Sequence, residues 1–114
     1  MLPSAHRMTR AAEFSAVVRS GERARRGTLV LYQLPNLDLS RSHVSRVGLI
    51  VGKGVGGSVV RHRVSRKLRA QLAARLDRLP VGSGLVVRAL PDAAEASSSE
   101  LAVDLDRALA RLGL

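Results

Sequence analysis

Apolar residues recur at every fourth position through the middle of the chain. This spacing predicts a helix with one apolar face, beginning with Ser58 as its cap and running to about Leu79. The glycine-rich residues 52–57 precede this predicted helix, and Pro80 and Gly82 end it. The apolar stripe consists of Val60, Val64, Leu68, Leu72 and Leu76.

Two shorter helices are predicted on either side of this central helix. The first covers residues 10–19, with Thr9 as its expected cap and Gly21 as its stop. The second begins at Ser97, because Glu100 three residues later completes a capping box. An apolar series follows this box to the end of the chain, as expected for a helix that packs on a core.

Strands are predicted between the helices. Residues 28–32 and 44–51 read as two strands paired as a hairpin across a turn and polar loop at 35–42, and residues 85–90 read as a third. Residues 22–26 offer a further short strand. Helices and strands therefore alternate in the order α-β-β-α-β-α, which predicts a single domain over residues 1–114, an α/β sandwich with one central sheet backed by helices.

Charge is distributed unevenly along this pattern. The net charge is +10, and residues 39–76 contain nine Arg or Lys without a single Asp or Glu. Residues 77–114 contain six acidic and four basic residues. A polyanionic partner explains one acid-free basic region better than a general need for solubility does. Seventeen of the nineteen cations are Arg, which makes two-pronged contacts with phosphate and stacks on bases.

The composition excludes several classes of chemistry. The chain has no Cys, which removes disulfides, thiol catalysis and thiolate-held metals. Its carboxylates and three His are scattered, so we expect no catalytic residue and no metal site on this chain. No apolar run approaches the ~18 residues of a membrane span, and the start of the chain lacks a signal-peptide pattern. We expect a cytoplasmic protein without a membrane or protein partner.

The central helix carries the strongest functional signal. On a helical wheel, a polar and basic face lies opposite the apolar stripe, and Arg63, Arg66 and Arg69 follow one another at intervals of three. Such a face is often merely solvated, but solvated faces usually mix both signs of charge. Phe14 and Tyr32 are the only aromatic residues; each could belong to the core or stack on an unpaired base.

Residues 46–69 resemble the signature of the bacterial ribonuclease P protein subunit. They read RVGLIVGKGVGGSVVRHRVSRKLR, against a family pattern of roughly RxGxxVxKKxGxAVxRNRxKRxxR. Arg7 to Arg10, Phe14, Gly21 and residues 30–32 also look like that family, so the resemblance covers nearly the whole chain. It implies a sandwich like domain 2 of ribosomal protein S5, with a left-handed crossover between parallel strands, whereas sequence alone favours the right-handed form.

The resemblance also implies a function. The chain would assist a catalytic RNA, the partner that cleaves the 5′ leader from precursor tRNA, so that it belongs to an endoribonuclease without holding the chemistry. Mg²⁺ would be held mainly by the RNA partner and the substrate. A cleft between the first helix and the sheet would hold the single-stranded leader, at Phe14, Tyr32 and Lys53. The residues implied to dock the catalytic RNA are Arg61, His62, Arg63, Arg66 and Arg69.

The chain departs from the family pattern at several positions. His62 replaces the usual Asn and Ser65 a usual Lys, while Val18 stands where an aromatic residue is common and Ile50 where a small polar one is common. Leader stacking could therefore differ here. The competing hypothesis is a general RNA-binding or ribosomal-type protein with no role in cleavage. A third, a basic protein on anionic membranes, ranks last because the basic face has no large apolar residues beside its cations.

Overall fold

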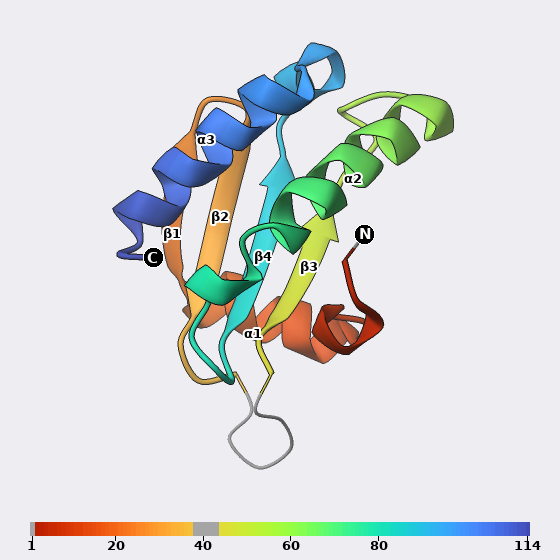
Figure 1. The fold of residues 1–114 in the computed structure, drawn as a ribbon. Helices are drawn as coiled ribbons and strands as arrows, with labels where there is room; N and C mark the ends of the chain where they lie inside the picture. The colour runs from red at the N-terminus through yellow and green to blue at the C-terminus, as the bar shows by residue number, and fades with distance from the viewer. Residues whose placement is uncertain (1, 38–43) are drawn as a thin grey trace.

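The structure, a computed structural model, describes residues 2–37 and 44–114. Over this part of the chain it contains one four-stranded sheet with the strand order β1-β2-β4-β3 (Figure 1). β2 is antiparallel to both β1 and β4, whereas β3 runs parallel to β4. The strands are β1 at Glu22–Arg26, β2 at Leu29–Leu34, β3 at Arg46–Ile50 and β4 at Gly84–Ala89.

Helices cover both faces of the sheet. The α-helices are α1 at Ala11–Ser20, α2 at Ser58–Ala73 and α3 at Ser98–Arg111, and short 3₁₀ turns occupy Ser4–His6, Leu76–Arg78 and Pro91–Glu95. α2 and α3 lie side by side on one face, and α1 crosses the other near one end of the strands (Figure 1). The predicted α/β sandwich with a central sheet is therefore confirmed, with α1 added on the second face.

The core has a part on each side of the sheet. Leu31, Leu68 and Leu105 are fully buried in the larger part, between the sheet and α2 and α3. Val17 and Val86 lie in the smaller part, under α1. Adjacent residues of β2 and β4 point alternately into the two parts, so these central strands are buried on both faces and read as continuous apolar runs.

The predicted hairpin between residues 28–32 and 44–51 is wrong. β2 instead pairs with β1 and with β4, which is inserted between β2 and β3. The physical reason is that β4, apolar on both faces, gains the most burial at the centre of the sheet. The optional strand at residues 22–26 is confirmed as β1. Part of the predicted connecting loop, residues 38–43, lies outside the described residues.

The connection from β3 through α2 to β4 has an uncommon hand. In Figure 1, β3 and β4 point upward, α2 lies on the near side, and the chain passes from β3 on the right to β4 on its left. This is a left-handed crossover, opposite to the hand that nearly all parallel β-α-β units adopt. The family resemblance implied it, and strand pattern alone did not.

The helix ends only partly follow their predicted caps. The Ser97–Glu100 capping box is present, and it lowers the pKa of Glu100 because the backbone N–H of Ser97 donates to its carboxylate. The caps predicted at Thr9 and Ser58 are wrong: the N-cap residues are Arg10 and Gly57, and neither makes a side-chain cap bond. α2 also ends earlier than predicted, at Ala73, and a 3₁₀ turn carries the chain on to Leu79.

Candidate nucleic-acid interface

The apolar stripe of α2 fixes which of its cations face outward. Val64, Leu68 and Leu72 are buried against the larger core, as the spacing of four predicts. The opposite side of the helix must then face solvent, and both Arg63 and Arg66 are exposed. The predicted basic face is thus a consequence of how α2 is anchored to the sheet.

His62, Arg66 and Arg69 line a common hollow on this face. They lie four and then three residues apart, so they share one side of α2, and Ala70 completes the helical wall. The fifth lining residue is Arg7, from the segment that precedes α1. The cavity has a volume of about 450 Å³. We call it the basic hollow.

Arg7 is a residue of this site that the wheel analysis missed. Its Nε donates a hydrogen bond to the carbonyl of Leu2 at 3.1 Å, which fixes the side chain at the rim of the hollow. The segment itself is attached to the sheet, because Met8 N–H donates to Val47 O at 2.8 Å and Arg7 forms a parallel bridge with Val47. The only sequence signal for Arg7 was its place in the N-terminal piece of the family resemblance.

The two other predicted docking residues lie apart from this hollow. Arg63 is exposed but does not line the hollow, so the structure groups His62 rather than Arg63 with Arg66 and Arg69. Arg61 is half-buried, and its Nε is buried without a hydrogen-bond partner within the described residues. All five predicted residues thus lie on α2, three of them in the basic hollow and two outside it.

Acidic side chains pair with other arginines and leave this surface unneutralised. Asp106 of α3 accepts hydrogen bonds from Arg75 Nε at 2.6 Å and from Arg78 Nη1 at 2.7 Å. These contacts lower the pKa of Asp106, chiefly through the hydrogen bond with Arg75, and raise the pKa of Arg75. Glu13 lies 3.7 Å from Arg46. Over residues 2–37 and 44–114, no ion pair involves a residue of the basic hollow.

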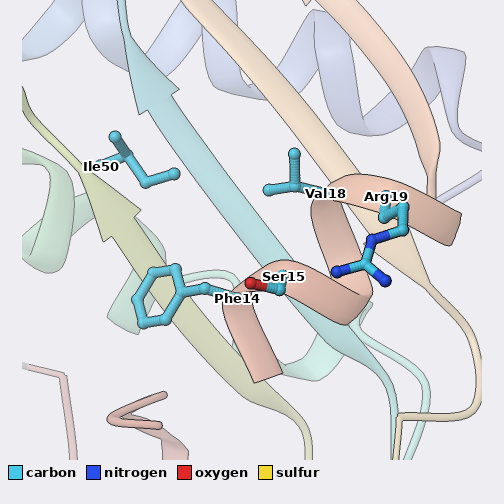
Figure 2. Close-up of a pocket in the computed structure, with 5 residues that line it drawn as sticks. All are labelled: Phe14, Ser15, Val18, Arg19 and Ile50. Carbon is cyan, nitrogen blue, oxygen red and sulfur yellow. The ribbon is translucent and has the colours of Figure 1, made fainter. Parts of the chain in front are cut away.

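A second hollow lies on the other face of the sheet, beside α1. Phe14, Val18 and Arg19 of α1 line it together with Ile50 of β3, and its volume is about 460 Å³ (Figure 2). The Phe14 ring also lies over the backbone of Gly48, where an added methyl group would collide with it. The missing side chain at Gly48 therefore lets the ring lie against β3. We call this the α1 hollow.

The three predicted leader residues are not all brought together here. Phe14 lines the α1 hollow, whereas Tyr32 is only 8% exposed and packs in the smaller core beneath α1. Lys53 is exposed in the turn that follows β3 and does not line the hollow. Tyr32 thus fits the core reading of its ring more closely than the stacking reading.

Strand register also places Arg25 and Arg88, which sequence reasoning did not select, on this face. Arg25 of β1 pairs with Val30, Val30 with Arg88, and Arg88 with Ile50, across all four strands. Directly opposed residues share one face of a sheet, and Ile50 lines the α1 hollow, so this whole row faces the α1 side. Arg25 and Arg88 are both exposed. Arg88 could not be found without knowing that β4 lies between β2 and β3.

Two other kinds of site are absent from the part of the chain that the structure describes. No helix there is both long and apolar enough to cross a membrane. No group of three or more His, Asp or Glu side chains within residues 2–37 and 44–114 could hold a metal ion.

The fold and its two hollows define a class: a small α/β protein with a left-handed crossover and an unneutralised arginine face on the crossover helix. Comparison with known proteins gives the family. The Ribonuclease P family model matches residues 2–113. The chain therefore belongs to the family of ribonuclease P protein components.

Individual relatives agree over nearly the full length. The ribonuclease P protein component of Corynebacterium diphtheriae is 46% identical, covering 98% of this chain and 97% of its own. That of Mycobacterium sp. strain KMS is 50% identical, covering 97% and 92%. The RNase P protein structure from Staphylococcus aureus is 20% identical and superposes with a TM-score of 0.81 over 94% of each chain, so that likeness supports the fold.

Proposed function

We propose that this chain binds the catalytic RNA of ribonuclease P and the 5′ leader of precursor tRNA, and so assists endonucleolytic removal of the leader. The observation that carries the proposal is the α2 surface, where cations are exposed and no described acid pairs with them. Phosphates of an RNA backbone would supply the missing anions. The residues proposed to dock the catalytic RNA are Arg61, His62, Arg63, Arg66 and Arg69.

The α1 hollow is the proposed leader site. Phe14 offers a ring that an unpaired base can stack on, and the apolar walls at Val18 and Ile50 suit the flat face of a base. Arg19 in the hollow and Arg88 on the adjoining sheet face would contact the leader phosphates. Lys53, in the turn beyond β3, would extend this contact. Tyr32 would form part of the floor and support Phe14 from below, rather than stack.

The chemistry is proposed to reside in the RNA partner. Mg²⁺ would be held mainly by that RNA and the substrate, and it would assist attack of water on the phosphodiester. The chain's own contribution is cationic: each Arg that contacts a phosphate displaces condensed counterions and reduces repulsion between the two RNAs. Less Mg²⁺ should then be needed to hold enzyme and substrate together. We place this activity in the cytoplasm, on a single domain spanning residues 1–114.

Reconstitution tests the proposal directly. The chain is added to the cognate catalytic RNA at low Mg²⁺ with a precursor tRNA, and leader removal is measured over a range of protein concentrations. We expect cleavage to rise with wild-type protein and to rise much less with Arg66→Gln. Arg111→Gln is the matched control, because it removes one exposed positive charge from α3. If wild type and buffer give the same rate, the chain has no role in cleavage, and the general RNA-binding alternative is favoured.

A further inference from the structure

The basic hollow differs from the rest of the cationic surface because one of its lining groups is an imidazole. Its guanidinium groups belong to Arg7, Arg66 and Arg69, which are cationic at every physiological pH. His62 is an imidazole, and imidazoles as a class gain and lose a proton in the physiological range. An amide side chain such as that of Asn has no such chemistry.

The charges around His62 all have the same sign. Arg66 and Arg69 face it from its own helix and Arg7 faces it from the N-terminal segment, and the lining of the hollow includes no acid. An anion in the hollow would attract an imidazolium at His62 and would screen the three guanidinium groups from it. Occupation of the hollow by an anion should therefore take up a proton.

We propose that the basic hollow binds one backbone phosphate of an RNA with His62 protonated, so that RNA binding is coupled to proton uptake at this imidazole. The inference rests on the proposed function, because it takes the RNA partner as given. The volume of about 450 Å³ accommodates a phosphate with its adjoining sugar. Arg7 supplies a hydrogen-bond donor from outside α2, so the phosphate would contact both α2 and the segment that precedes α1.

The proton uptake is measured by calorimetric titration of the protein with the cognate catalytic RNA. Titrations are run in two phosphate-free buffers of different ionisation enthalpy, and the difference in heat gives the number of protons bound per complex. For wild type we expect a substantial fraction of one proton, and an affinity about fivefold higher at about pH 6 than at about pH 8. His62→Asn should abolish both effects, and His62→Lys should keep the higher affinity at both pH values.

Two control variants separate this site from the surface around it. Arg63→Gln removes a neighbouring exposed charge outside the hollow, so it should weaken binding but leave proton uptake unchanged. Arg7→Gln should weaken binding, and its effect should be smaller when His62 is already Asn, because both residues hold the same phosphate. Arg7→Lys keeps the charge and should recover most of the affinity. Thermal unfolding of each variant checks that the N-terminal segment is still folded.

The outcomes discriminate clearly. Tight RNA binding without proton uptake, or with uptake that persists in His62→Asn, overturns this inference and leaves the proposed function intact. Additive effects of Arg7→Gln and His62→Asn overturn the shared phosphate. Failure of wild type to bind the catalytic RNA at either pH overturns the inference and the proposed function together. A titration of the protein with inorganic phosphate is the last measurement. Saturation of the hollow at concentrations as low as those of RNA would mean that it is a site for free phosphate, and would overturn the inference.

Discussion

Asp106 connects the C-terminal helix to the end of α2, and its replacement by Asn has a predictable cost. Its carboxylate accepts two hydrogen bonds from Arg75, at 2.6 and 3.1 Å, and one from Arg78 at 2.7 Å. Asn keeps the shape but loses the charge and presents an amide N–H₂ to a guanidinium. The Arg75 side chain is 16% exposed and that of Asp106 is 47% exposed, so solvent screens the pair only in part.

The magnitude follows from this geometry. Exposed ion pairs contribute about 0.2–1 kcal/mol each, and hydrogen bonds to charged groups up to about 3 kcal/mol when desolvated. Two arginines on one half-exposed carboxylate place the loss at about 1–1.5 kcal/mol. For a domain of this size we expect Asp106→Asn to lower the melting temperature by about 5 °C at neutral pH. Asp77→Asn, which changes an exposed acid without a described partner, is the control and should shift it little.

The loss should depend on pH with a defined sign. Because Arg75 lowers the pKa of Asp106 in the folded protein, this carboxylate stabilises the fold above its unfolded pKa of about 3.9. That stabilisation is lost as the pH falls through the lower, folded pKa. Wild type and Asp106→Asn should therefore converge in melting temperature at acid pH and diverge at neutral pH. A gap that stays constant over this range, or that 1 M salt leaves unchanged, would refute an electrostatic origin.

Three further changes test other parts of the structure. Gly27→Ala should cost about 1–3 kcal/mol in denaturant unfolding, because Gly27 has φ +54 and an added methyl group would collide with the Asp104 carboxylate. Val18→Phe adds a ring to the α1 hollow and should lower KM severalfold for a precursor with a long leader, and not for one with the leader shortened. Arg63→Ala should reduce the salt dependence of RNA binding by about one phosphate contact, whereas Arg111→Ala should not.

Periodicity predicted the elements of this fold more reliably than their partners. The spacing of four residues identified the buried face of α2 correctly, because the helical period alone decides that Val64 and Leu68 share a face. The hairpin prediction failed because strand pairing depends on distant residues. β4 comes after α2 in sequence, yet it separates β2 from β3. A preference for pairing successive strands cannot anticipate an insertion of that kind.

Prediction of the candidate sites from sequence was limited in the same way, because it could not anticipate contacts between distant residues. The exposure of His62 and Arg66 followed from their position opposite the apolar stripe, so one helix was enough to predict it. Arg7 lies at the basic hollow because it forms a bridge with Val47. Arg88 lies on the α1 side of the sheet because it pairs with Ile50. Both placements depend on tertiary contacts. No local pattern could have selected these two arginines over the others.

The placement of the acids explains why only some arginines remain available. Residues 58–78 carry basic side chains throughout, but Asp106 of α3 binds the two at the C-terminal end, Arg75 and Arg78. Among residues 2–37 and 44–114, the cations nearer the start of α2 pair with no acid, since Asp106 of α3 contacts the other end of this basic run. The acidic C-terminal third therefore has a structural role: Asp106, by pairing with Arg75 and Arg78, sets where the proposed RNA-binding surface ends. Asp106→Asn would release both guanidinium groups, so RNA binding should become more salt-dependent even as the fold becomes less stable.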